Sequence, residues 1–111
     1  MTIVDLNTAL EHLRVDEPGE RQIVELYLQA AEDAAIQFLN RPLYPDPLSL
    51  AGAREAGIAG EHGMVITPSV HSAILMILAG LYANRGDGPD TGGLPRQARW
   101  LLEPFRVGIG A

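Results

Sequence analysis

The sequence contains one run of apolar residues, Ala73–Ala83, that is interrupted only by Gly80. Thr67-Pro68 shortly before it is a typical helix start, with Thr as the capping residue and Pro in the first turn. The predicted helix, over about residues 68–85, is apolar on every side, so it must be central in the fold or covered by a partner. The run is far shorter than the ~20 residues that a membrane-spanning helix needs.

The composition narrows the possible functions. The 111 residues carry a net charge of -6, and all eight basic residues are arginine. An acidic chain is a poor candidate for gripping nucleic acid through its phosphates, which requires a basic surface. Cysteine is absent, which excludes disulfides and thiolate metal sites. The length of 111 residues predicts a single domain over residues 1–111. We also expect a soluble protein, because the first residues lack the basic and long apolar regions of a signal peptide.

Periodic apolar residues predict two helices in the first forty residues. Asp5 can cap a short helix over about residues 5–15, whose apolar face is formed mainly by leucines. A long helix over about residues 18–40 carries two adjacent apolar stripes, a broader face than one packing partner requires. The stripes consist of Ile23, Tyr27, Ala30, Ala34 and Phe38, and of Val24, Leu28, Ala31, Ala35 and Leu39.

The middle of the chain is the least regular part. Prolines and glycines indicate a long irregular loop over residues 41–67. Within it, Pro47–Glu55 can form a short helix capped by Asp46, and Met64–Ile66 can form a short extended piece.

The end of the chain combines a loop, a helix and a tail. The Gly/Asp-rich residues 86–93 predict a hinge, a short helix follows over about residues 95–103, and residues 104–111 form an extended C-terminal arm. The predicted fold class is therefore all-α, a small bundle of about four helices, two long and two short.

The polar residues do not predict a catalytic or metal site. The three histidines, His12, His62 and His71, have no partners at metal-ligand spacing. Glu32 and Asp33 are adjacent on a helix and diverge, so paired-carboxylate catalysis is not expected. We therefore expect a protein without enzymatic activity, cofactor or metal.

Four arginines lie at or just beyond predicted helix ends. Arg14, Arg41 and Arg85 are placed where a cation interacts favourably with the last carbonyls of a helix. Arg106 lies beyond Pro104 in the tail, so an interfacial salt bridge is the better interpretation for it.

Four segments follow one another along the chain: HLRVD (12–16), FLNRPLY (38–44), AILMILAGLYANRGD (73–87) and LPRQARWLLEPFRVGIG (94–110). Together they resemble the head–tail connector, or adaptor, family of long-tailed phages and prophages, and a gene transfer agent would carry a similar part. The likeness lies in a Leu-Arg-Val exit from the first helix, an Asn-Arg end on the apolar helix, and a late Leu-Leu-x-Pro-aromatic-Arg pattern.

The resemblance implies a non-enzymatic helical bundle that assembles as a homo-oligomeric ring of about 12 copies beneath a portal protein. The ring would continue the channel for double-stranded DNA, which passes without specific binding. It would also present a surface to the next connector, stopper or tail component. The resemblance places the chain at the head–tail junction of a virion-like particle, made in a bacterial cytoplasm.

Two sets of residues are candidate contact sites. Aromatic residues and arginine are the usual anchors of buried contacts, so we expect portal docking by the last helix and the arm, and subunit contacts on the two long helices. The portal-docking candidates are Trp100, Leu101, Pro104, Phe105, Arg106 and Val107. The subunit-interface candidates are Tyr27, Leu78, Tyr82, Asn84 and Arg85.

A small helical DNA-binding or regulatory module is the alternative. Such a module needs a basic recognition helix, whereas the apolar helix has no arginine before Arg85 and the last helix offers only Arg96 and Arg99. Binding to duplex DNA that weakens steeply with salt would favour this alternative.

Overall fold

The computed structural model describes residues 2–83 and 94–108. Within these ranges the chain forms five α-helices, two 3-10 turns and one pair of two-residue strands, so the predicted all-α bundle is confirmed. The elements are α1 (Leu6–Leu13), η1 (Pro18–Glu20), α2 (Arg21–Leu39), β1 (Leu43–Tyr44), α3 (Pro47–Glu55), β2 (Met64–Val65), α4 (Pro68–Ala83), α5 (Arg96–Leu102) and η2 (Glu103–Phe105).

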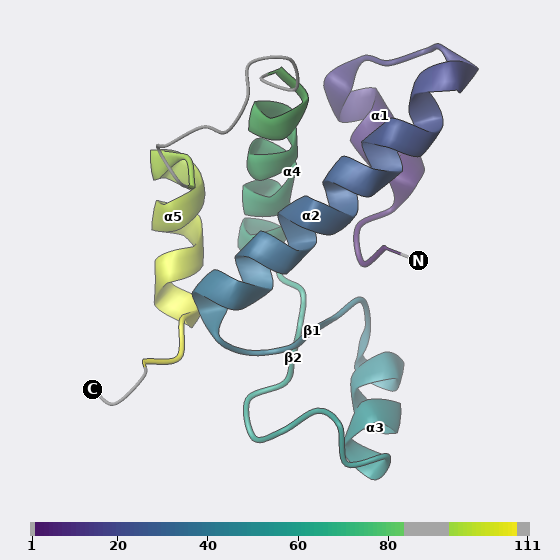
Figure 1. The fold of residues 1–111 in the computed structure, drawn as a ribbon. Helices are drawn as coiled ribbons and strands as arrows, with labels where there is room; N and C mark the ends of the chain where they lie inside the picture. The colour runs from purple at the N-terminus through teal and green to yellow at the C-terminus, as the bar shows by residue number, and fades with distance from the viewer. Residues whose placement is uncertain (1, 84–93, 109–111) are drawn as a thin grey trace.

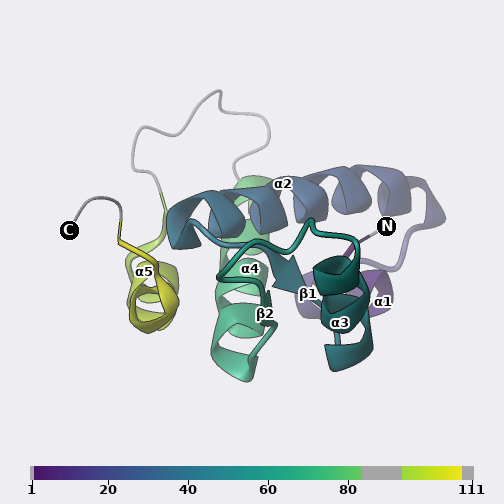
Figure 2. The ribbon, with the colours of Figure 1, turned by 90° about the horizontal axis from the view of Figure 1, so that it is seen from below.

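Three helices form a row, which α2 crosses (Figure 1). α4 lies in the middle of this helix row, with α5 on one side and α1 on the other. Figure 2 shows all three helices on the same face of α2, while α3 and the two strands form a smaller lobe next to them. The two ends of the helix row are therefore α5 and α1, on opposite sides of the molecule.

The central position of α4 explains its apolar sequence. Packing against α1, α2 and α5 covers it on several sides. Burying a Leu or Ile side chain completely stabilises a fold by about 1.5–3 kcal/mol, so this helix is a large contributor to the core. Of the two possibilities that the sequence left open, the central position is the one observed. The buried residues of α4 are Val70, Ala73, Ile74, Leu75, Ile77 and Leu78.

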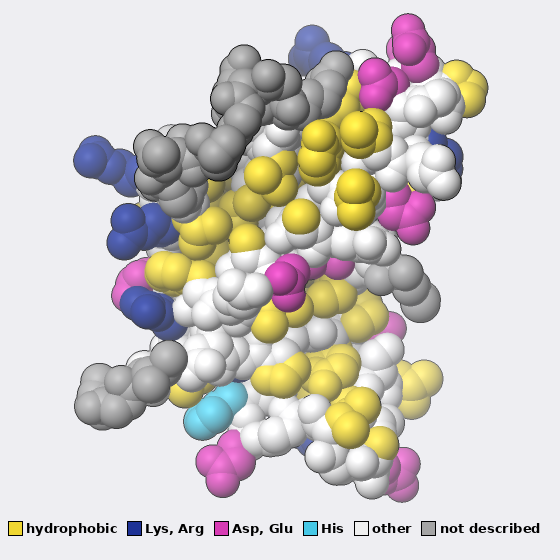
Figure 3. Space-filling model, viewed as in Figure 1, with side chains coloured by type: hydrophobic (Ala, Val, Ile, Leu, Met, Phe, Trp, Pro, Cys, Tyr) yellow, Lys and Arg dark blue, Asp and Glu magenta, His cyan; other side chains and the backbone are white. Residues whose placement is uncertain are grey.

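α2 uses its two predicted stripes differently. The stripe that begins at Val24 and ends at Leu39 is fully buried in the core, with five residues of zero exposure. The stripe that begins at Ile23 and ends at Phe38 is only half-buried for most of its length, and Leu26 beside it is 60 % exposed. In Figure 3 hydrophobic side chains follow the course of α2 across the viewed face. The breadth of the apolar face thus exceeds what the domain itself covers.

α1 and α2 end earlier than predicted, because a residue in the left-handed conformation follows each of them. Arg14 (φ 58°) follows α1, and Asn40 (φ 57°) follows α2. Asn adopts this conformation more readily than most residues, which suits it to the end of a helix. At the start of α1, Asp5 acts as the predicted cap and accepts a hydrogen bond from the Thr8 N–H at 3.2 Å.

The predicted loop over residues 41–67 holds the smaller lobe. The short helix expected there is α3, and the Asp46 carboxylate caps it by accepting a 2.7 Å hydrogen bond from the Ser49 N–H. Hydrogen bonds from Ser49 lower the pKa of Asp46. The extended piece expected near Met64 is β2. It pairs in parallel with β1, with Met64 opposite Leu43.

A close backbone approach at Gly63 closes the lobe. Leu50, Ala53 and Ala59 form a second, small apolar cluster there. A β-carbon on Gly63 would come within 3.0 Å of both the Ala59 carbonyl oxygen and Cδ1 of Leu50. The lobe therefore needs glycine at this position for lack of space.

Candidate interaction surfaces

The segment after α5 is attached to the C-terminal end of α2. The Val107 N–H donates to the Leu39 carbonyl at 2.9 Å, which pairs one of the carbonyls that a helix end leaves without a partner. Arg41 donates from Nη1 to the Phe105 carbonyl at 3.2 Å and from Nε to the His62 carbonyl at 2.6 Å. One side chain thus joins the end of α2, the lobe and the C-terminal segment.

Arg106 contributes a further contact to this attachment. Its guanidinium lies over the ring of Phe38, 4.7 Å from the ring centre. A cation over an aromatic ring contributes about 0.5–1 kcal/mol at an exposed site. The sequence suggested a salt bridge across an interface for Arg106, whereas the contact observed is a cation–π contact within the chain. The first residues of the predicted arm are therefore packed on the domain.

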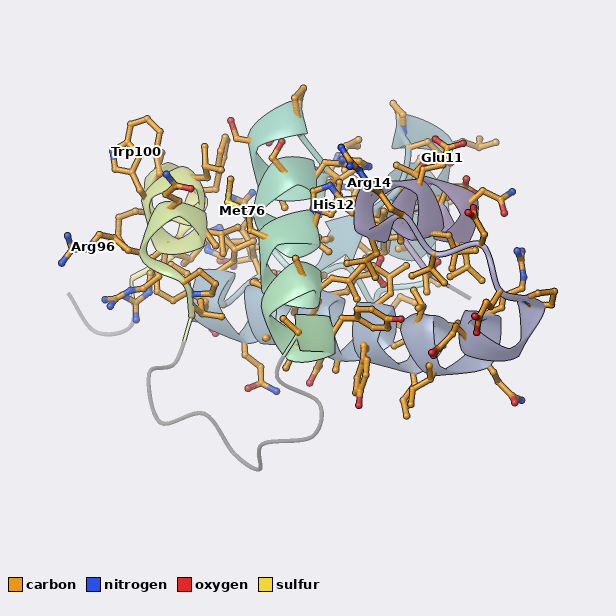
Figure 4. All side chains as sticks on the ribbon, turned by 90° about the horizontal axis from the view of Figure 1, so that it is seen from above. Glu11, His12, Arg14, Met76, Arg96 and Trp100 are labelled. Carbon is orange, nitrogen blue, oxygen red and sulfur yellow. The ribbon has the colours of Figure 1, made fainter. Side chains whose placement is uncertain are left out.

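α5 presents an exposed basic and aromatic surface. Ala98 and Leu102, one helical turn apart, are buried in the core. Trp100 is 75 % exposed, and Arg96 and Arg99 are exposed as well. These three residues are called the α5 surface below, and Figure 4 shows Trp100 and Arg96 projecting from α5 at one end of the helix row. A shallow hollow of about 460 Å³ on this surface is lined by Leu94, Arg96, Arg99, Trp100 and Glu103.

The opposite end of the helix row is acidic. Residues 11–20 contain four carboxylates and one arginine. Asp16 and Glu17, between α1 and η1, are exposed. In Figure 4, Glu11 lies across α4 from Trp100. A hollow of about 610 Å³, called the acidic groove below, is lined by Asn7, Leu10, Glu11, Arg14, Val15 and Asp16.

The structure divides the predicted portal-docking residues into two groups. Trp100, Pro104 and Arg106 are exposed and available to a partner. Leu101 and Phe105 are half-buried because they pack against the core of their own chain. Val107 is half-buried as well, next to the end of α2.

The predicted subunit-interface residues are not brought together as one exposed set. Leu78 is fully buried in the core, which removes its side chain from any interface. Tyr27 and Tyr82 are half-buried. Asn84 and Arg85 lie outside the described residues, as does the whole of the predicted hinge over residues 86–93.

Sequence reasoning missed two exposed leucines near this region. Leu26 of α2 is 60 % exposed, and Leu81 near the end of α4 is 38 % exposed. Leu26 belongs to neither apolar stripe of α2, and that isolation is the signal that could have identified it. Leu81 carried no such signal, because the sequence around it is apolar on all sides.

Histidines and carboxylates do not form a metal-binding group in the described parts of the chain. His62 lies 4.0 Å from the Glu61 carboxylate, and both side chains are largely exposed. In the same residues, each helix falls short of the length and apolar character that crossing a membrane requires.

The comparisons with known proteins agree with the resemblance noted in the sequence, which is thereby confirmed. A family model described as phage gp6-like head-tail connector protein matches residues 3–93. The matched stretch includes α1 to α4 and ends before α5. No curated protein and no solved structure matches the chain. Because the match spans well over half of the sequence, the chain belongs to the phage gp6-like head–tail connector family.

Proposed function

We propose that this connector assembles as a ring of about 12 copies below the portal of a phage-like particle, joins the head to the tail and continues the DNA channel. Membership of the connector family is the observation that carries the proposal. The role is structural rather than catalytic. The ring stands at the head–tail junction and offers its far side to the next connector, stopper or tail component.

The apolar surface of α2 supports an assembled state. Leu26 and the half-buried stripe from Ile23 to Phe38 expose apolar area that the chain does not cover itself. Contiguous exposed apolar patches are typical of contacts with other proteins. Tyr27 of α2 and Tyr82 of α4 remain our candidates for subunit contact.

The net charge supports passage of DNA without retention. At -6 per chain, about 12 copies would carry a charge of about -72, and like charge repels phosphates. A channel wall with this balance would guide DNA without holding it. Double-stranded DNA therefore passes through the ring without being bound specifically by the chain.

Portal docking is assigned to the C-terminal segment that starts at Pro104. Its root is fixed to α2 by the hydrogen bonds of Val107 and Arg41 and by the stacking of Arg106 on Phe38. A fixed root holds the first residues of the arm in one direction, which lowers the entropy cost of docking. Pro104 and Arg106 are the exposed residues of this segment that we propose to contact the portal.

The test is assembly on the portal protein of the same particle, followed by electron microscopy. We expect the wild-type chain to add a ring beneath the portal. A wild-type chain that leaves the portal bare at high protein concentration would refute the function.

A truncation tests the arm separately. Removing residues 104–111 also removes Phe105 and Val107 from the core and the α2 end, so the sharper variant lacks only residues 108–111. We expect it to unfold like the wild type but to bind the portal at least tenfold more weakly. Leu48→Ser, at an 83 % exposed position of the lobe, is the control. Unchanged binding by the truncated chain would exclude residues 108–111 from the docking contact and leave Pro104 and Arg106 as its only candidates in this segment.

A further inference from the structure

The two ends of the helix row differ in charge and in shape. At the α5 end, residues 94–107 carry three arginines and one glutamate. At the α1 end, residues 11–20 carry four carboxylates and one arginine. Figure 3 shows dark blue side chains along the edge occupied by α5, and acidic side chains gathered at the corner where α1 leads into α2. A chain that is acidic overall thus concentrates opposite charges at opposite ends.

The α5 end provides a projecting anchor. Trp100 is 75 % exposed on a helix whose other side, Ala98 and Leu102, is fully buried. Trp and Arg are the side chains most often found at the energetic centre of protein interfaces. Trp100, with Arg96 and Arg99 beside it on the helix, therefore has the character of a docking anchor. Single exposed apolar residues are normal on protein surfaces, so it is the combination of Trp100 with two exposed arginines that marks this surface as a contact.

The α1 end provides a matching recess. Leu10 and Val15 contribute apolar atoms to the acidic groove, whose volume is about 610 Å³. Glu11 and Asp16 contribute carboxylates to the same groove, and Glu17 is the next exposed residue. Arg14 also lines the groove, and Arg21 donates a 3.2 Å hydrogen bond to Asn7 at its edge, so the carboxylates outnumber the guanidinium groups by a small margin. A recess with apolar and acidic lining suits an indole ring accompanied by guanidinium groups, which pair with carboxylates through two parallel hydrogen bonds.

We propose that the α5 surface of one copy docks into the acidic groove of the next copy of this chain. The proposal rests on the proposed ring function and names the surfaces that build it. The two surfaces lie at opposite ends of the helix row, so each copy keeps one of each free for a further neighbour. Such a head-to-tail contact generates a ring when its rotation closes, which a contact between two identical surfaces does not.

Charge reversal on each surface tests the pairing. One variant is Arg96→Glu with Arg99→Glu, and the other is Asp16→Arg with Glu17→Arg. All four side chains are exposed, so both variants should fold, which thermal unfolding followed by circular dichroism checks. The measurement is the number of copies per portal ring by native mass spectrometry. We expect each variant to lower ring occupancy at least tenfold, and Trp100→Ala to do the same.

The decisive part of the experiment is whether complementary variants restore ring assembly. A chain with all four reversals has an acidic α5 surface and a basic groove, and it should assemble again. An equal mixture of the two double variants should also assemble, since each surface then meets its complement. Failure of both to assemble would overturn the pairing, as would full rings from either double variant alone. Glu55→Arg with Glu61→Arg, two exposed positions outside both surfaces, is the matched charge control.

The outcomes separate this pairing from the function itself. A wild-type chain that never binds the portal would refute the function, whereas wild-type rings that tolerate the reversals would refute only the pairing. The Arg96/Arg99 variant is also compared with the wild type in a duplex-DNA gel shift. If the variant loses salt-sensitive DNA binding while its rings stay intact, the α5 surface contacts nucleic acid and the pairing is wrong.

Discussion

The backbone N–H of Val4 donates a 2.6 Å hydrogen bond to Oε2 of Glu32, a carboxylate that is only 6 % exposed. Val4 is itself buried, so this bond ties the segment before α1 to the middle of α2. Burial raises the pKa of Glu32, while backbone hydrogen bonds from Val4 and Ile3 act in the opposite direction. Desolvation is the larger effect, so the buried charge costs stability at neutral pH.

Glu32→Gln should reveal this cost through its pH dependence. Because the pKa of Glu32 in the folded state is raised above the ordinary value of 4.5, the folded state retains a proton that the unfolded state releases. This contribution to stability is fully present below pH 4.5 and is lost as the pH rises through the folded-state pKa. We expect the free energy of unfolding of the wild type, minus that of the variant, to fall over this window and then level off.

Urea unfolding at a series of pH values measures this difference. Asp33→Asn, at the adjacent exposed position, removes one carboxylate from the same helix and is the control for the change in net charge. A difference for Glu32→Gln that increases with pH would contradict the raised pKa.

Arg41→Ala should weaken the attachment of the C-terminal segment. The variant loses the hydrogen bonds to the His62 and Phe105 carbonyls, and bonds of this kind that involve a charged group contribute about 1.5–3 kcal/mol each. Because one bond is exposed and the other partly buried, we expect the free energy of unfolding to fall by about 1–3 kcal/mol in total. Chemical denaturation measures it, with Arg54→Ala on α3 as an exposed control expected to stay within about 0.5 kcal/mol. Equal effects for the two arginines would argue against the joining role of Arg41.

Two glycines of the lobe should respond to alanine with opposite signs. At Gly63 a β-carbon meets the Ala59 carbonyl oxygen and Leu50 at 3.0 Å, and overpacking of this kind costs about 1–3 kcal/mol. At Gly52, inside α3, a β-carbon meets nothing within 4 Å, and Ala stabilises a helix interior by about 0.5–1 kcal/mol relative to Gly. Thermal unfolding of Gly63→Ala and Gly52→Ala compares them. A stabilised Gly63→Ala protein would show that the backbone approach is looser than described.

Leu78→Ala and Leu26→Ala should separate core from surface. Leu78 is fully buried, so its truncation should cost about 2–5 kcal/mol in the free energy of unfolding. Leu26 is 60 % exposed, and its truncation should change stability by less than about 0.5 kcal/mol. The same denaturation experiment measures both. If Leu78→Ala lowers the free energy of unfolding only slightly, Leu78 is not part of the core and becomes a candidate for the subunit interface again.

Much of the secondary structure could be predicted from the sequence, because its signals are local. Asp5 and Asp46 cap helices as expected, and the Thr67 hydroxyl accepts a hydrogen bond from the Val70 N–H at the start of α4. Each of these signals acts within one helical turn, where chain neighbours meet whatever the rest of the fold does. The family resemblance was likewise visible in short segments, three of which lie within the matched residues 3–93.

Only the tertiary structure decided which residues are buried in the core and which form the exposed surfaces. Periodicity gave α2 two equivalent apolar stripes, and packing on the helix row chose the one that ends at Leu39 for the core. The same packing buried Leu78, laid Arg106 over Phe38 and left Trp100 exposed. The fold places the α5 surface and the acidic groove on opposite sides of α4, and this separation of opposite charges cannot be read from the sequence. These relations join residues far apart in the chain, and helix periodicity carries no information about which helix lies beside which.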